Sequence, residues 1–189
     1  MKVILIGYRA TGKSTVGKLL SKKLKIPFVD TDQLIEEAAG MPIKEIIAIK
    51  GWEKFREKEI AAIASLRNMT LCVVATGGGA IVSGVNRELL RNTGTLVYLK
   101  TPLDDIVERL QRDAQTEQIR PQFTSGDLVT ETIAALKERI PIYETAADFT
   151  VDTDGKSIVR VSDEIYQHLL ETGIVSDISK MKKRLKNNL

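Results

Sequence analysis

The 189-residue chain has one cysteine, no long apolar run and little net charge, and each scarcity excludes a class of protein. Cys72 has no partner for an internal disulfide, and its apolar neighbours from Leu71 to Ala75 indicate a small buried side chain rather than a reactive thiol. No apolar stretch reaches the 18 or more residues of a membrane span, and the N-terminus lacks the pattern of a secretory signal. We therefore expect a cytoplasmic protein with no membrane partner.

The net charge of +3 is unevenly distributed along the chain. Residues 173–189 hold five Lys and Arg against Asp177 alone, which is +4 for this segment and leaves −1 for the rest. Such a segment can bind nucleic acid or an acidic membrane, but a short charged run at a chain end is more often solvated. We expect a flexible basic tail at 173–189, no nucleic-acid partner, and one monomeric domain over 1–172.

What the sequence does contain is an alternation of short apolar runs with amphipathic segments, which is typical of a parallel sheet covered on both faces. The polar segment 113–126, rich in Gln and Thr, is long for a loop in a compact domain and is expected to be a mobile lid. The fold class predicted is α/β, with a five-stranded parallel sheet flanked by helices. Strands are expected near 2–7, 27–30, 71–76, 95–100 and 148–152, and helices near 13–25, 31–39, 43–49, 51–67, 84–92, 102–112, 127–146 and 157–171.

The first apolar run leads into Gly7-Tyr8-Arg9-Ala10-Thr11-Gly12-Lys13-Ser14, which matches the phosphate-binding pattern G-x-x-x-x-G-K-[ST] between a strand and a helix. Backbone N–H groups of such a loop point at the β-phosphate, and the following helix directs its positive end at the same place. Lys13 adds a charge for the β- and γ-phosphates, while the Ser14 hydroxyl is suited to Mg²⁺. The pattern predicts binding of ATP and Mg²⁺ by Ala10, Thr11, Gly12, Lys13, Ser14 and Thr15.

Ligands of parallel α/β sheets bind beyond the carboxyl ends of the strands, so the residues that follow each strand are informative. Asp30 and Asp32 follow the second expected strand, where one carboxylate can face the metal and phosphates and the other the acceptor; capping of the next helix is the alternative. The third expected strand is followed by Thr76-Gly77-Gly78-Gly79-Ala80. Because glycine has no Cβ, the backbone N–H groups of this segment can approach a substrate closely. A plain loop is the alternative reading there.

Three arginines complete the candidate site, although each alone is compatible with an ordinary surface position. Arg56 lies in Phe55-Arg56-Glu57-Lys58-Glu59, Arg120 precedes Pro121 in the expected lid, and Arg139 precedes Pro141 and Tyr143. A pair of arginines is what a small carboxylate substrate requires for bidentate binding.

Together these motifs resemble the shikimate kinase family over residues 1 to about 171. The matching elements are the phosphate loop, Asp30-x-Asp32, Phe55-Arg56-x-x-Glu59, the three glycines, Arg120-Pro121, Arg139-x-Pro141-x-Tyr143 and Ala147-Asp148. The resemblance implies a P-loop kinase fold and transfer of a phosphoryl group from ATP to the 3-hydroxyl of shikimate, in the synthesis of chorismate and aromatic amino acids.

The resemblance also implies roles for individual residues. Lys13, Asp32 and Arg120 would be catalytic, with Asp32 either removing the proton of the attacking hydroxyl or only orienting it. Ser14 and Asp30 would serve the metal, and Arg120 would close onto the phosphates with the lid. Arg109 would stack on adenine, with Lys156 beside it. The shikimate-binding residues would be Asp32, Arg56, Gly78, Gly79 and Arg139.

Some positions depart from the family pattern, and two other functions remain open. Ala10 stands where the family often has glycine, and Gln122-Phe123 where it usually has two leucines; Arg112 competes with Arg109 for adenine. A P-loop kinase of another hydroxy acid, such as gluconate, would not need Arg56 and Arg139 with three glycines. A regulatory module that binds nucleotide without catalysis would lack groups on the acceptor side.

Overall fold

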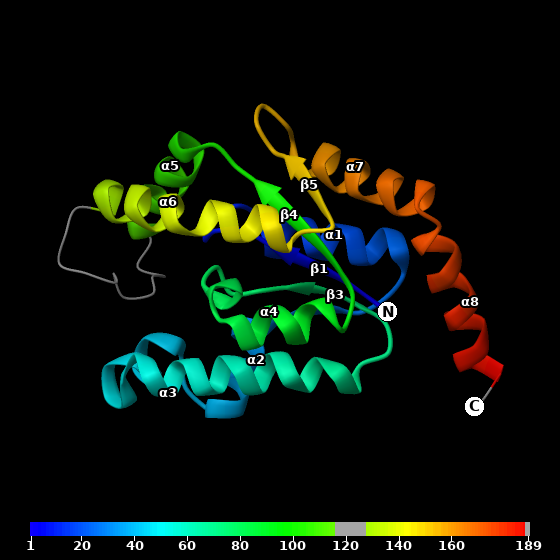
Figure 1. Ribbon diagram of the computed structural model, residues 1–189, viewed down its shortest axis with the longest axis horizontal. Helices are drawn as coiled ribbons and strands as arrows, with labels where there is room; N and C mark the ends of the chain where they lie inside the picture. The colour runs from blue at the N-terminus through cyan, green and yellow to red at the C-terminus, as the bar shows by residue number, and fades with distance from the viewer. Residues whose placement is uncertain (116–127, 188–189) are drawn as a thin grey trace.

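The computed structural model describes residues 1–115 and 128–187, which form a parallel sheet between two layers of helices (Figure 1). The strand order is β2-β3-β1-β4-β5, and every pairing is parallel. This confirms the predicted fold class. Most of the expected lid, including Arg120, lies outside the described residues. The elements are β1 (Lys2–Ile6), α1 (Lys13–Leu24), β2 (Phe28–Asp30), α2 (Thr31–Ala39), α3 (Ile43–Ser65), η1 (Leu66–Asn68), β3 (Cys72–Ala75), η2 (Ala80–Val82), α4 (Gly84–Arg91), β4 (Thr95–Lys100), α5 (Leu103–Gln115), α6 (Leu128–Ala146), β5 (Phe149–Asp152), α7 (Ile158–Glu171) and α8 (Ile174–Asn187).

The central strand β1 explains why the sheet has two covered faces. All five of its residues are buried, as expected of a strand with helices on both sides. Because side chains alternate along a strand, Ile4 and Ile6 join a core with α3 to α6, while Val3 and Leu5 join a second core with α1, α7 and α8. In register, Ile4 lies between Val74 of β3 and Leu96 of β4.

The two helices expected at 43–49 and 51–67 lie within α3, which is interrupted at Gly51. Gly51 has φ 79° and ψ 170°, a conformation outside the helical region that glycine adopts without steric cost. The second part of α3 carries Phe55, Arg56 and Glu59, so this break sets the direction of the helix that faces the site.

The C-terminal segment differs from the flexible tail expected from sequence. Residues 174–187 form α8, which packs beside α7 at the edge of the molecule (Figure 1). Ile178 is 2% exposed and belongs to the core beneath α1 and α7, while the Lys182 ammonium donates to the carbonyl of Leu24 at 2.5 Å. Between its charged residues this segment has an apolar stripe at helical spacing, formed by Ile174, Val175, Ile178 and Met181.

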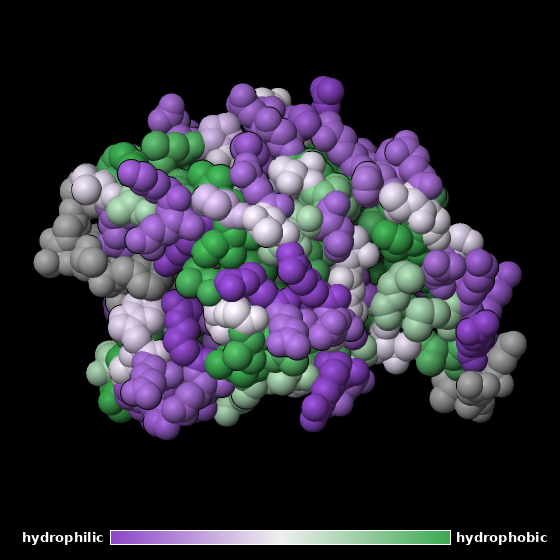
Figure 2. Space-filling view, viewed as in Figure 1, coloured by the Kyte–Doolittle hydropathy of each residue, from purple (hydrophilic) through white to green (hydrophobic). Residues whose placement is uncertain are grey.

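The visible surface carries no broad apolar face. Figure 2 shows hydrophobic residues in small groups separated by hydrophilic side chains. Among the described helices, none is long and apolar enough to cross a membrane.

Candidate functional site

The loop between β1 and α1 has the shape of an anion-binding cradle. Gly12 takes a left-handed conformation, φ 86° and ψ 10°, immediately before α1 begins at Lys13. The Tyr8 carbonyl accepts hydrogen bonds from the Lys13 ammonium at 2.5 Å and the Thr11 hydroxyl at 2.8 Å. Lys13 is therefore held inside the loop, and the N-terminus of α1 adds its partial positive charge there.

Ala10, the position where the family often has glycine, is in the left-handed region with φ 62°. An L-residue with a Cβ pays roughly 1–2 kcal/mol for this conformation. The loop therefore keeps the shape that a glycine would give it, at a local cost in backbone strain.

The expected metal side of the site is formed by Ser14 and Asp30. The Ser14 hydroxyl donates to Asp30 Oδ2 at 2.6 Å, and Asp30 Oδ1 accepts from the Asp32 N–H at 3.0 Å as the N-cap of α2. The capping interpretation is thus correct for Asp30, and its second oxygen remains directed at Ser14. No group of three or more His, Cys, Asp or Glu able to hold a metal is found in the described part of the chain. A hydroxyl and a carboxylate do fit Mg²⁺, which commonly uses one or two protein oxygens together with phosphates.

Asp32 borders a cavity at the phosphate loop. A cavity of about 270 Å³ is lined by Asp32 together with Lys13, Ser14, Thr76 and Gly78. The structure therefore brings the second carboxylate of the Asp30-x-Asp32 pair beside the phosphate loop.

A second cavity of about 370 Å³ opens on the outer side of the loop, between it and α7. Arg109 lines this cavity, donates to the Ala10 carbonyl at 3.2 Å and pairs with Asp105 at 2.8 Å. Lys156 also lines it and pairs with Glu164 at 2.7 Å. Arg112 instead pairs with Glu108 on the exposed face of α5 and does not line the cavity. The geometry thus favours Arg109 over Arg112 as a neighbour of the nucleotide.

The three glycines after β3 pack against the two other loops of the site. A Cβ on Gly77 would lie 2.7 Å from Asp32 Oδ1, and one on Gly78 would lie 2.7 Å from the backbone nitrogen of Arg9. At Gly78 the neighbour is backbone, so packing excludes a side chain there, whereas a side chain at Gly77 would displace the Asp32 carboxylate.

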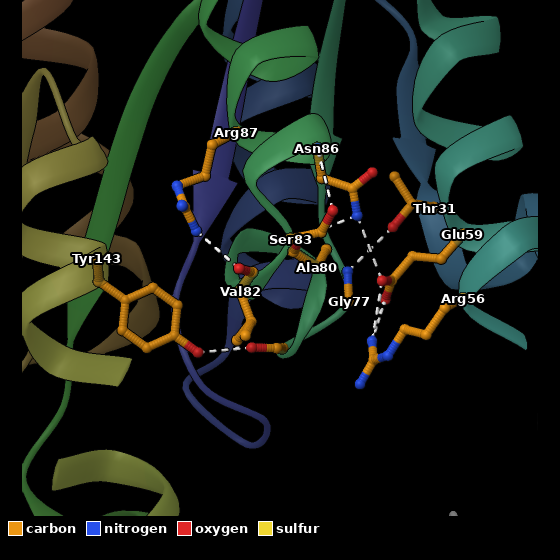
Figure 3. Close-up of polar contacts among 11 residues, drawn as sticks. Thr31, Arg56, Glu59, Gly77, Ala80, Val82, Ser83, Asn86, Arg87 and Tyr143 are labelled. Atoms are coloured by element: carbon orange, nitrogen blue, oxygen red, sulfur yellow. Dashed lines mark hydrogen bonds and ion pairs between the residues drawn. The ribbon is translucent and has the colours of Figure 1, made fainter. Parts of the chain in front are cut away.

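The third cavity, about 340 Å³, has Arg56, Gly79 and Arg139 in its wall. The Arg56 Nη1 donates to both carboxylate oxygens of Glu59 at 2.9 Å, and Glu59 is 1% exposed (Figure 3). A Cβ on Gly79 would lie 3.2 Å from the Arg56 guanidinium, so the glycine loop and this arginine are in close contact. The guanidinium of Arg139 lies over the Tyr8 ring, 5.5 Å from its centroid. Two arginines from distant helices thus share one pocket.

Several supporting residues of the site were not assigned by sequence reasoning. Glu59 is three residues after Arg56 on one helix, and that spacing could have indicated the ion pair. Asn86 gives no such signal, yet its buried amide donates to the Ala80 carbonyl at 3.0 Å and to Glu59 at 3.3 Å. Tyr143 was noted only as part of a motif, and its hydroxyl donates to the Gly78 carbonyl at 2.5 Å (Figure 3).

The chain is similar to known proteins in both sequence and structure. Residues 9–172 match the family model for shikimate kinase. The shikimate kinase of Syntrophus aciditrophicus (strain SB) is 44% identical over 172 residues, covering 86% of this chain and 88% of that protein. That of Legionella pneumophila (strain Corby) is 40% identical over 167 residues, covering 88% and 93%. The structure of shikimate kinase from Acinetobacter baumannii in complex with shikimate aligns with a TM-score of 0.83 and 33% identity, over 90% of this chain and 93% of that chain. The chain belongs to the shikimate kinase family.

Proposed function

We propose that this protein transfers the γ-phosphoryl group of ATP to the 3-hydroxyl of shikimate, giving ADP and shikimate 3-phosphate. One observation carries the proposal: Arg56, Arg139 and Gly79 line a pocket next to the cavity of Lys13, Ser14 and Asp32. Gly78 and Gly79 are neighbours in one short loop, so the two cavities meet at that loop. If the two arginines bind the carboxylate of a small acceptor, the rest of that acceptor would extend toward Asp32 and the phosphates.

In this proposal the residues of the chain act mainly by position and charge. In phosphoryl transfer the protein takes little part in covalent steps. The rate depends on the alignment of the two substrates and on cations around the phosphates. Lys13 stabilises the β- and γ-phosphates, and Asp32 accepts a hydrogen bond from the attacking hydroxyl. Arg56 and Arg139 bind the carboxylate, with backbone N–H groups of Gly78 and Gly79.

The nucleotide would occupy the phosphate loop and the cavity beside it. Ala10, Thr11, Gly12 and Thr15 line that cavity, and Arg109 and Lys156 would lie next to the adenine. Ser14 and Asp30 would hold Mg²⁺, which supplies positive charge at the phosphate oxygens when bound. Arg120 is assigned to the phosphates from the family resemblance and lies outside the described residues.

A coupled ADP-release assay with shikimate, quinate and gluconate tests the proposal. We expect turnover with shikimate and a much lower specificity constant for the other two acceptors. ADP release with gluconate instead of shikimate would support the hydroxy-acid alternative. Nucleotide binding without ADP release on any acceptor would support the regulatory module, and each of these results would refute the proposed reaction.

A further inference from the structure

The glycine-rich loop is held by side chains from three different elements. The Thr31 hydroxyl of α2 accepts from the Gly77 N–H at 3.0 Å, and Asn86 of α4 donates to the Ala80 carbonyl at 3.0 Å. Between these two anchors, the Gly78 carbonyl accepts from Tyr143 of α6 at 2.5 Å. Figure 3 shows Tyr143 approaching from one side of the loop while Arg56 and Glu59 lie on the other.

The direction of the Gly78 carbonyl determines the direction of a second group. Gly78 C=O and Gly79 N–H belong to one planar trans peptide, so they point in opposite directions. Gly79 lines the same pocket as Arg56 and Arg139. A carbonyl turned toward Tyr143 therefore turns the Gly79 N–H away from Tyr143, to the side of the loop on which Arg56 lies.

The Ala80 N–H donates to the Gly77 carbonyl at 3.0 Å, and this turn hydrogen bond does not involve the groups of the Gly78–Gly79 peptide, so it does not select an orientation for that peptide. Gly79 has φ −98°, and a flip of about 180° would bring φ to about +80°, a value that glycine adopts as readily as the first. The flipped peptide would direct its carbonyl toward Arg56, where the oxygen would repel a bound carboxylate. A contact from outside the loop is thus needed to select the productive orientation.

The Tyr143 phenol is well suited to supply that contact. It is 1% exposed and stacks on Tyr98 with ring centroids 5.0 Å apart and an interplanar angle of 18°. Burial raises the pKa of the Tyr143 hydroxyl well above its usual value, against the opposing effect of Arg139, so the group stays protonated as a donor. Arg139 lies one helical turn before Tyr143, and its guanidinium also interacts with the Tyr143 hydroxyl.

We propose that Tyr143 is a positioning residue for acceptor binding: its hydroxyl holds the Gly78–Gly79 peptide so that the Gly79 N–H faces the acceptor carboxylate. The inference rests on the proposed function, because it assumes that the pocket of Arg56 and Arg139 takes a carboxylate. It assigns to Tyr143 no contact with the substrate or the reacting atoms.

The test compares Tyr143→Phe with Tyr98→Phe, which removes a hydroxyl from the stacked neighbour. In the described part of the chain Tyr98 makes no hydrogen bond to the glycine loop, so the pair separates the contacts of the Tyr143 hydroxyl, with Gly78 and with Arg139, from the loss of a hydroxyl in the stacked rings. We expect Tyr143→Phe to raise the shikimate KM about ten-fold, equivalent to 1.4 kcal/mol, with the ATP KM changed less than about two-fold. Tyr98→Phe should leave both constants near those of the wild type.

An acceptor with a hydroxymethyl group in place of the carboxylate tests whether Tyr143 acts on the carboxylate side of the acceptor. If Tyr143 acts through the carboxylate site, Tyr143→Phe should weaken the binding of shikimate much more than the binding of this analogue. An equal loss with both acceptors, an equal loss in Tyr98→Phe, or an unchanged shikimate KM would overturn the inference. A wild-type protein that releases no ADP with shikimate would instead refute the proposed function.

A measurement on the wild-type protein covers the case in which Tyr143→Phe does not fold. In a ¹⁵N-labelled sample, the Gly79 amide resonance should shift on addition of shikimate and much less on addition of the hydroxymethyl analogue. No shift at Gly79, or the same shift with both compounds, would contradict the assigned direction of the peptide.

Discussion

Removal of α8 should destabilise the protein without changing its chemistry. A truncation after Gly173 deletes Ile178, which is 2% exposed, and with it the partly buried Ile174, Val175 and Met181. Full burial of one isoleucine side chain stabilises by about 1.5–3 kcal/mol, and the other three contribute part of that each. The entropy of ordering a terminal helix opposes this gain. We therefore expect a net loss of about 3 kcal/mol in the free energy of unfolding.

For a domain of this size, a loss of that magnitude lowers the melting temperature by roughly 6–12 °C. Ile178→Ala removes most of the same side chain and typically costs about 2–5 kcal/mol in a rigid core. Here its cost cannot exceed the docking free energy of α8, because the helix can detach instead. The loss of stability caused by Ile178→Ala should thus approach that caused by the truncation without exceeding it. Ser176→Ala, at an exposed position on the same helix, should have the melting temperature of the wild type.

Thermal unfolding followed by circular dichroism measures these shifts, and steady-state kinetics measures the activity. The contact of Lys182 is at Leu24, the end of α1, about 16 Å of helix away from Lys13 at its start. At a temperature where all variants are folded, kcat should therefore stay near that of the full chain. A truncated protein that melts within about 2 °C of the full chain would refute the docking of α8.

Three further predictions concern the site and the single cysteine. Arg56→Ala or Arg139→Ala should raise the shikimate KM ten- to hundred-fold in steady-state assays, because a charge-assisted hydrogen bond contributes roughly 1.5–3 kcal/mol. The ATP KM should change little, and Arg91→Ala, an exposed arginine, is the matched control; unchanged shikimate KM in both variants would refute the carboxylate assignment. Arg120→Ala should lower kcat about a hundred-fold with a smaller effect on the shikimate KM, and a kcat within three-fold of the wild type would remove Arg120 from the catalytic residues. Cys72 is 1% exposed and burial raises its thiol pKa, so a thiol reagent such as DTNB should react slowly with the folded protein and rapidly after unfolding; fast reaction in the folded state would contradict this.

Much of the fold was predictable because its signals are local. Each strand is a short apolar run followed by a turn or a helix start, and β4 has the predicted bounds while the other strands differ by one residue at one end or, for β3, at both. The phosphate loop is also local, since its shape depends on the backbone of eight consecutive residues. The break at Gly51 was predictable for the same reason.

The C-terminal segment was misinterpreted because its two signals point in different directions. Its charge density indicates a solvated tail, and only contact with α7 and the end of α1 gives its apolar stripe a surface to cover. A sequence contains the stripe but does not show whether a complementary surface exists.

The residue types and spacing predicted a phosphate-binding loop, and they identified the candidate arginines and carboxylates. Only the tertiary structure decided that Arg109 rather than Arg112 lines the cavity beside the phosphate loop, and that Asn86 and Tyr143 support the glycine loop. Tyr143 and Gly78 are 65 residues apart, and their contact depends on how α6 packs against the sheet. Motifs predict chemistry carried by consecutive residues, whereas the direction of a single peptide in the site depends on side chains that long-range packing brings to it.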